Sequence, residues 1–187
     1  MANFDIYAPF LRSWEGGFTN NKNDRGGKTY AGVTIATWND YCKRKNIFGY
    51  SAQMKNMTEA QWTDIMKSGY WDACWCDLIK SQGVANLIAD WAVNSGPSTA
   101  IKKVQTTIGK GLKVDCRMGP NTLTAINNMT PGVLFVLLRN KRKEYYEALA
   151  NKDKSQATFL NGWLRRTNAL RLNSYVLNDK KSTERKF

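Results

Sequence analysis

Residues 14–34 read WEGGFTNNKNDRGGKTYAGVT, and this stretch joins the end of an expected helix to a short expected strand. The helix is indicated by four apolar residues with i, i+3, i+4 and i+7 spacing. These residues are Tyr7, Phe10, Leu11 and Trp14. We expect Pro9 in the first turn, where proline is tolerated, and Gly16-Gly17 at the end, because glycine suits the left-handed cap position. Residues 18–28 are turn-rich and predict a loop, and the β-branched residues in 29–35 predict a short strand or hairpin arm.

Helical patterns dominate the rest of the chain. Thr58 and Gln61 form a capping-box pattern that opens a helix toward Met66. Asn94-Ser-Gly-Pro97 interrupts the pattern, and Thr130-Pro131 supplies a cap and first residue for a long helix. The further helices that we expect cover about residues 84–91, 98–108, 120–126, 130–149 and 158–175. The fold class that follows is mainly α, with one small β element near residues 29–35 and a mobile basic tail.

The chain is strongly basic, with 28 Lys and Arg against 15 Asp and Glu, a formal net charge of +13. Residues 139–187 hold 13 basic and 5 acidic side chains, so this final stretch supplies +8 of that charge. Such an excess is typical of a solvated face, and also of attraction to nucleic acid, an anionic membrane or an anionic cell wall. Charge alone does not choose among these partners.

The N-terminal 15 residues contain Asp5, Pro9 and Arg12 and no continuous apolar run, so we expect no secretory signal. No apolar run reaches the length of a membrane span. We therefore expect synthesis in the cytoplasm without a signal peptide, and action elsewhere only through another exit route.

The chain contains no histidine, which removes Ser-His-Asp and Cys-His nucleophilic machinery and the histidine-based zinc sites. The four cysteines lack paired C-x-x-C spacing, and we expect reduced, mostly buried thiols. We expect no metal ion and no cofactor. If the protein is an enzyme, carboxylates are the best remaining acid–base groups.

Two carboxylates flank the glycine-rich stretch. Glu15 lies at the C-terminal end of the first expected helix, where the helix dipole disfavours a carboxylate and raises its pKa. Asp24 follows nine residues later in a loop whose glycines allow a sharp turn toward Glu15. A glycosidase requires two carboxyl groups on either side of one bond, one of them protonated. Thr29 could hold a water molecule near Asp24. Each residue alone would be read as structural.

Together these segments resemble a known family of enzymes that cleave bacterial cell walls. EGGF (Glu15–Phe18), NDRGGKT (Asn23–Thr29) and AGVT (Ala31–Thr34) resemble the signature of the glycoside hydrolase family 108 N-acetylmuramidases, also described as secretion activator proteins. GYW (Gly69–Trp71) and DWAVNSG (Asp90–Gly96) fit the same family. The following part resembles a predicted peptidoglycan-binding domain, through KVQTTIG (Lys103–Gly109), VDCRMGPNT (Val114–Thr122) and FLNGWLRR (Phe159–Arg166). In that domain the usual Asp-Gly pair is Asp115-Cys116 here.

The resemblance implies a lysozyme-like α+β fold and cleavage of the β-1,4 bond between N-acetylmuramic acid and N-acetylglucosamine. It implies a hydrolase domain over residues 1–92, a helical peptidoglycan-binding domain over 93–178 packed against it, and a basic tail over 179–187. It makes Glu15 the essential acid. Glu15, Asp24 and Thr29 also follow the order of the Glu, Asp and Thr of phage lysozymes, with Thr29 one residue closer to the Asp.

Four further residues are candidates for lining the sugar cleft: Tyr30, Trp71, Asp90 and Asn94. Asp90 is alternatively a hydrogen-bonding residue at the domain junction. Trp38 or Trp71 could stack on sugar faces, although tryptophans are by default core residues.

Three other functions stay open at this point. A lytic transglycosylase would need Glu15 but no water-activating Asp24. A binding or export-accessory protein would need neither, and a nucleic-acid-binding protein is supported by charge alone, with no recognised motif. The leading hypothesis is an endolysin-like or secretion-activator-like monomer that acts on peptidoglycan after holin-type or other release and binds no nucleic acid.

Overall fold

The computed structural model describes residues 1–15, 29–109 and 111–173. Most of these residues form helices, as the sequence predicts, with one β-hairpin. The longer elements are α1 (Phe4–Trp14), β1 (Thr29–Tyr30), β2 (Val33–Thr34), α2 (Ile35–Lys45), α3 (Glu59–Met66), α4 (Gln82–Ser95), α5 (Pro97–Ile108), α6 (Pro120–Asn128), α7 (Pro131–Lys152) and α8 (Leu160–Ala169). Short 3-10 or π turns cover Gly49–Ala52, Met54–Asn56, Lys67–Trp71, Asp72–Cys74, Cys76–Leu78 and Lys154–Phe159.

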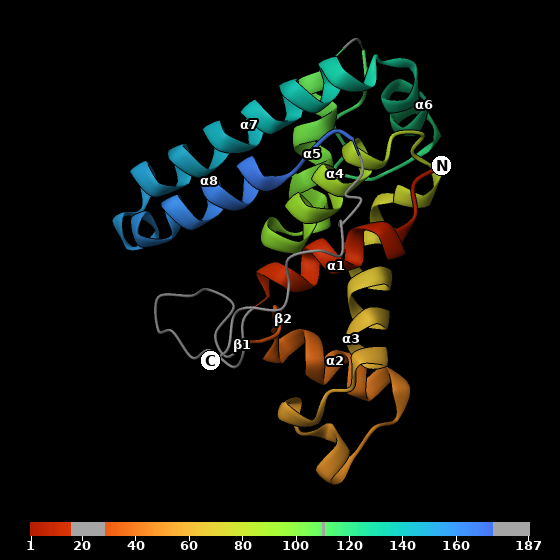
Figure 1. Ribbon diagram of the computed structural model, residues 1–187, viewed down its shortest axis with the longest axis vertical. Coiled ribbons are helices and arrows are strands. Elements are labelled where there is room, and N and C mark those ends of the chain that lie inside the picture. The colour runs from red at the N-terminus through yellow and green to blue at the C-terminus, as the bar shows by residue number, and fades with distance from the viewer. Residues whose placement is uncertain (16–28, 110, 174–187) are drawn as a thin grey trace, which may run out of the picture.

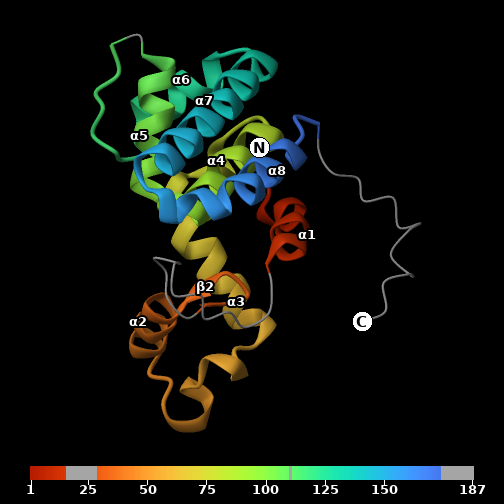
Figure 2. The same cartoon turned by 90° about the vertical axis from the view of Figure 1, so that its left-hand side faces the viewer.

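The helices form two lobes (Figure 1). The lower lobe contains the hairpin, α2 and α3, and the upper lobe contains α4 to α8. Helix α1 lies between them, a position that the perpendicular view in Figure 2 confirms. Among the described residues, no helix combines the length and apolar character that a membrane span requires.

Helix α1 begins at Phe4 because Asn3 caps it, with the Asn3 side chain accepting a hydrogen bond from the Asp5 amide. The expectation for Pro9 was wrong, since this start places Pro9 in the second turn, where it removes one backbone hydrogen bond. The predicted apolar face compensates, because Tyr7, Phe10 and Leu11 are buried and Trp14 is half-buried, and Phe4, which was not predicted, is buried with them. The helix ends at Trp14, so Glu15 itself is the C-cap, with extended backbone angles. The predicted glycine cap and residues 18–28 lie outside the described residues.

The β element is a hairpin whose strands pair Thr29 with Thr34 and Tyr30 with Val33. Its two turn residues, Ala31 and Gly32, have φ values of 49° and 75°. Two successive positive φ values are characteristic of a type I′ turn, which matches the twist of the flanking strands. The indole Nε1 of Trp62 on α3 donates a hydrogen bond to the Ala31 carbonyl, at 2.8 Å, and holds the turn in place.

Helix α2 was not anticipated. Ile35 was expected in the strand, but Thr34 caps a helix there by accepting a hydrogen bond from the Thr37 amide. The capping box of Thr58 and Gln61 is confirmed, with both reciprocal hydrogen bonds formed at the start of α3.

Helix α4 is the centre of the upper lobe, buried from Gly83 to Ala92. The predicted break after it is confirmed, because Gly96 ends α4 and Pro97 begins α5. A Cβ atom at Gly83 would lie 2.2 Å from the Leu172 carbonyl oxygen, so glycine lets the chain after α8 pass directly over α4. Helix α8 is shorter than predicted, Leu160–Ala169, and the expected basic tail falls within residues 174–187, outside the described residues.

A buried charged cluster joins α1 to three helices of the upper lobe, α4, α7 and α8. Asp90 on α4 is fully buried and accepts hydrogen bonds from the Tyr7 hydroxyl at 2.9 Å and from Arg142 Nη2 at 2.8 Å. It also accepts from Arg166 Nε, at 3.1 Å, and Nη2, at 2.8 Å. These cations outweigh the effect of burial and lower the pKa of Asp90 to about 2.

We predict that Asp90→Asn lowers the free energy of unfolding by about 3–5 kcal/mol, because Arg142 and Arg166 then lack a buried counter-charge. In wild type, the low pKa makes Asp90 stabilising above about pH 4, and this contribution is lost as the pH falls toward 2. Chemical denaturation at several pH values measures both effects. Asp64→Asn, which breaks an exposed pair with Lys45, is the matched control and should cost less than about 1 kcal/mol. Equal losses in the two variants would contradict a stabilising role for the cluster.

Candidate active site

The Glu15 side chain lies where α1, the hairpin and α8 meet. The side chain is 8% exposed, and Oε1 accepts a hydrogen bond from Arg166 Nη1 at 2.9 Å. The backbone amide of Glu15 donates to the Arg12 carbonyl at 3.2 Å, which fixes the chain at the helix end. The candidate acid is therefore held both by its backbone and by its side chain.

The hairpin turn closes against the second carboxyl oxygen of Glu15. A Cβ atom at Gly32 would lie 1.9 Å from Glu15 Oε2 and 2.4 Å from Cδ. Position 32 requires glycine for two reasons. Its φ is 75°, and the Glu15 carboxyl occupies the space where a side chain would lie.

Burial is the main cause of a raised pKa at Glu15. Arg166 opposes it through its charge and its hydrogen bond, Asp90 adds to it, and Arg12 opposes it. Desolvation prevails because the carboxyl is shielded from water on nearly all sides. Tyr70 also lies near Glu15: burial is the main cause of its raised pKa, a hydrogen bond with Thr37 opposes this, and the charge of Glu15 adds to it. A carboxyl held protonated above its usual range can act as a general acid.

The other predicted residues fall in different places. Asp24 lies outside the described residues, and Thr29 is described only by its backbone, in β1. Tyr30 is half-buried beside it in the hairpin, and Asn94 is exposed near the end of α4. Their roles in catalysis and sugar binding stay predictions.

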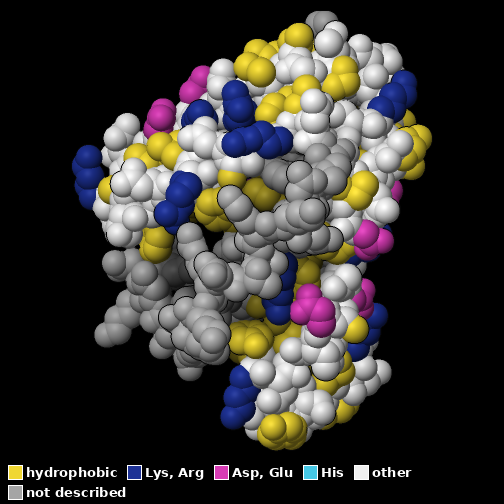
Figure 3. Space-filling view, in the orientation of Figure 1, with side chains coloured by type: hydrophobic (Ala, Val, Ile, Leu, Met, Phe, Trp, Pro, Cys, Tyr) yellow, Lys and Arg dark blue, Asp and Glu magenta, His cyan; other side chains and the backbone are white. Residues whose placement is uncertain are grey.

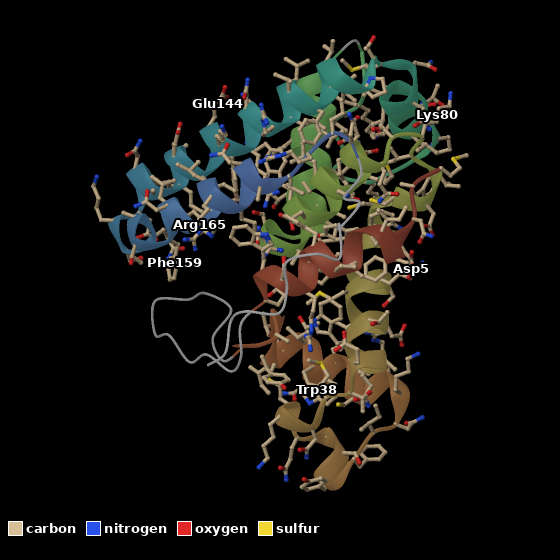
Figure 4. The ribbon with its side chains drawn as sticks, viewed as in Figure 1. Asp5, Trp38, Lys80, Glu144, Phe159 and Arg165 are labelled. Atoms are coloured by element: carbon tan, nitrogen blue, oxygen red, sulfur yellow. The ribbon has the colours of Figure 1, made fainter. Side chains whose placement is uncertain are left out.

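Two of the substrate contacts were wrong. Asp90 is fully buried, and its oxygens are occupied by Tyr7, Arg142 and Arg166, so it is the structural residue of the alternative interpretation. Trp71 is also fully buried, with its indole donating to Asp77 Oδ1 at 2.6 Å. Trp38 is likewise buried on α2, in the core of the lower lobe (Figure 4), so neither tryptophan can stack on a sugar in this structure.

Sequence reasoning missed the side chains that surround Glu15. Gly32, Tyr70 and Arg166 all stand in segments quoted for the family resemblance, AGVT, GYW and FLNGWLRR. Those motifs were the available signal. No spacing rule could have joined Arg166 to Glu15, because 151 residues separate them.

In the C-terminal part, Gln105 on α5 organises the loop that contains Asp115-Cys116. Its Nε2 donates to Asp115 Oδ1 at 2.9 Å and to Thr122 Oγ1 at 3.1 Å, and its Oε1 accepts from the Cys116 amide at 3.0 Å. Cys116 has a φ of 64°, the left-handed region that favours the glycine usual at this position. The turn is therefore preserved without glycine.

Comparison with known proteins gives the chain two consecutive matches. The family described as glycosyl hydrolase 108 matches residues 8–96, and a predicted peptidoglycan domain matches residues 97–168. Among solved structures, SagA of Brucella abortus is similar, with 28% identity, a TM-score of 0.72, and coverage of 89% of this chain and 91% of that chain. A comparison with curated proteins found no match. The matches agree with the lysozyme-like, mainly helical class predicted from the sequence.

We predict that Gly32→Ala lowers kcat by about 10²-fold or more, because the added methyl group displaces the Glu15 carboxyl. Gly49→Ala is the matched control. Gly49 has a similar φ of 63°, but a Cβ atom added there would meet no described atom within 4 Å beyond its chain neighbours, so this variant carries the backbone strain alone. Hydrolysis rates on purified cell walls measure the difference, and equal rates for the two variants would refute the steric argument.

Proposed function

Through residues 8–96 the chain belongs to the glycosyl hydrolase 108 family, with a peptidoglycan domain behind it, and we propose that this peptidoglycan hydrolase is an N-acetylmuramidase. The proposed reaction is hydrolysis of the β-1,4 bond between N-acetylmuramic acid and N-acetylglucosamine. Glu15 acts as the general acid. The observation that carries the proposal is the largely buried Glu15 carboxyl, with its raised pKa, at the junction of the two lobes.

In this mechanism Glu15 protonates the glycosidic oxygen as the bond to the sugar breaks. The sugar ring then carries the positive charge of an oxocarbenium-like transition state. Asp24 is proposed to activate the attacking water, with Thr29 helping to hold it. The alternative, a lytic transglycosylase, uses an internal hydroxyl of the sugar in place of water and needs no Asp24.

We further propose that the protein acts on the wall as a monomer, after holin-type or other release from the cytoplasm. The support for this is its resemblance to endolysin and secretion-activator proteins.

We predict that Glu15→Gln abolishes cleavage of purified peptidoglycan while circular dichroism and thermal unfolding show a folded protein. The amide cannot donate the acid proton, yet its oxygen can still accept the Arg166 hydrogen bond. In wild type, activity should fall on the alkaline side as Glu15 loses its proton, at a pH above the ordinary glutamate value of 4.5.

Mass analysis of the products separates the two mechanisms. Hydrolysis leaves reducing N-acetylmuramic acid ends, and transglycosylation leaves anhydro ends. Asp24→Asn should be severely impaired if water is the nucleophile. Anhydro products together with an active Asp24→Asn variant would establish the transglycosylase instead, and substantial activity in Glu15→Gln would remove Glu15 as the acid.

The surface of the upper lobe suggests how the wall is bound. Basic side chains gather over α7 and α8 in Figure 3. Lys152 and Lys154, at the turn between these helices, are exposed. Arg142 and Arg166, from the same basic stretch, are instead buried in ion pairs and contribute little to the surface.

We predict that the double variant Lys152→Glu, Lys154→Glu weakens binding to purified walls by several-fold and flattens its dependence on salt, because two attractive charges become repulsive. Lys55→Glu, an exposed charge reversal in the lower lobe, is the control. Co-sedimentation with purified walls at increasing salt gives the measurement. Unchanged affinity in the double variant, or an equal loss in the control, would exclude α7 and α8 as the binding face.

A further inference from the structure

Arg166 connects the two parts of the chain that the family matches separate. It lies on α8, within the predicted peptidoglycan domain, yet its Nη1 contacts Glu15 of the hydrolase domain at 2.9 Å. The Arg166 side chain is 9% exposed, and its guanidinium also contacts Asp90 at 2.8 Å through Nη2. One planar group thus bridges a structural carboxylate and the proposed acid.

Asp90 sets the orientation of this bridge. Arg166 Nε lies 3.1 Å from both Asp90 oxygens, and Nη2 adds a shorter bond to one of them. Since a guanidinium is rigid and planar, these contacts on one edge determine where Nη1 points. Arg142 and the Tyr7 hydroxyl hold Asp90 in turn, so the orientation does not depend on Glu15.

We propose that Arg166 is the positioning residue of the catalytic acid, and that it places the acid proton on Oε2 of Glu15. The proposal deepens the function above and rests on Glu15 being the acid. It means that the peptidoglycan domain contributes to the catalytic centre as well as to wall binding.

The position of the proton follows from hydrogen-bond chemistry. Arginine has only donors and does not lose its proton in proteins, so Oε1, which faces Nη1, must accept. A carbonyl oxygen is a better acceptor than a hydroxyl oxygen, so when Glu15 is protonated the contact with Arg166 favours Oε1 as the carbonyl and Oε2 as the hydroxyl. That oxygen faces Gly32, where the missing side chain leaves the space that the proton donor occupies.

Arg166 also acts on the ionisation of Glu15. The main charged groups that act on Glu15 are Arg166 on α8, Asp90 on α4 and Arg12 on α1. Glu15 in turn raises the pKa of Tyr70, in the turn after α3, although burial is the larger cause of that shift. Arg166 is the strongest of those that favour the carboxylate, and Asp90 opposes it. Removing Arg166 would therefore leave Glu15 beside Asp90 with less compensation, and Glu15 would hold its proton to higher pH.

The test is Arg166→Gln in the full-length chain, with Arg165→Gln and Arg142→Lys as controls. Arg165 is the exposed neighbour on α8 that stacks on Trp14 (labelled in Figure 4), and Arg142 binds the other side of Asp90 and the Tyr146 hydroxyl. We expect Arg166→Gln to lower kcat by about 10²-fold and to shift the alkaline limb of the pH–activity profile to higher pH. Arg165→Gln removes one charge from the proposed binding face but should not move the limb. Arg142→Lys should lose stability without moving the limb.

A direct titration of Glu15 by ¹³C NMR supplies a readout that does not need activity. The Glu15 pKa should be higher in Arg166→Gln than in wild type. If that variant does not fold, Arg166→Lys keeps the charge and loses the planar fork, and it should lower kcat with little change in the limb. An unchanged or lowered Glu15 pKa in folded Arg166→Gln, or full activity in Arg166→Lys, overturns the proposal. A wild-type protein that cleaves no peptidoglycan would instead defeat the proposed function, and the titration would still report on the contact.

Discussion

The buried ion pair between Asp90 and Arg166 is the interaction on which the arrangement of this protein depends. Asp90 comes from the most buried helix, and its partners come from α1, α7 and α8. Burying charges is unfavourable unless each is paired and hydrogen-bonded. Here both Asp90 oxygens accept several donors, so the cluster allows only the helix packing that brings all the partners together. A hydrophobic contact in the same place would tolerate small shifts, and this network does not.

The same pair determines the environment of the proposed acid. Glu15 is attached to the edge of the cluster through the one guanidinium nitrogen that Asp90 leaves available. Two opposing effects then act on it: burial favours the protonated form, and Arg166 favours the carboxylate. Burial prevails, but the cation keeps the carboxyl oriented and limits how far its pKa rises. A group that must both hold and release a proton in each turnover benefits from this balance.

The two matched domains therefore pack against each other and are joined by buried ion pairs. Only Gly96 separates α4 from α5, and the helices of the C-terminal part pack against α4. Two arginines that contribute to the basic composition of this part, Arg142 and Arg166, are buried in ion pairs with Asp90 and Glu15. The remaining exposed charges are available for an anionic wall, while the buried ones connect the helices proposed to bind the wall to the proposed catalytic carboxyl.

The sequence by itself determined the local structure and the choice of candidate acid. Apolar spacing located α1, the capping box located α3, and the residues around Glu15 pointed to a glycosidase, because these signals depend on neighbours within a few positions. The start of α1 at Phe4, and hence the place of Pro9, was missed because a single Asn cap decides it. Helix α2 was missed because its first residue, Ile35, ends the β-branched stretch that predicts a strand. Only the tertiary structure decided that Asp90 and Trp71 are interior residues, and that Arg166 reaches Glu15 across 151 positions. Burial and long-range ion pairing depend on which helices meet in space, and that information is absent from any short window of sequence.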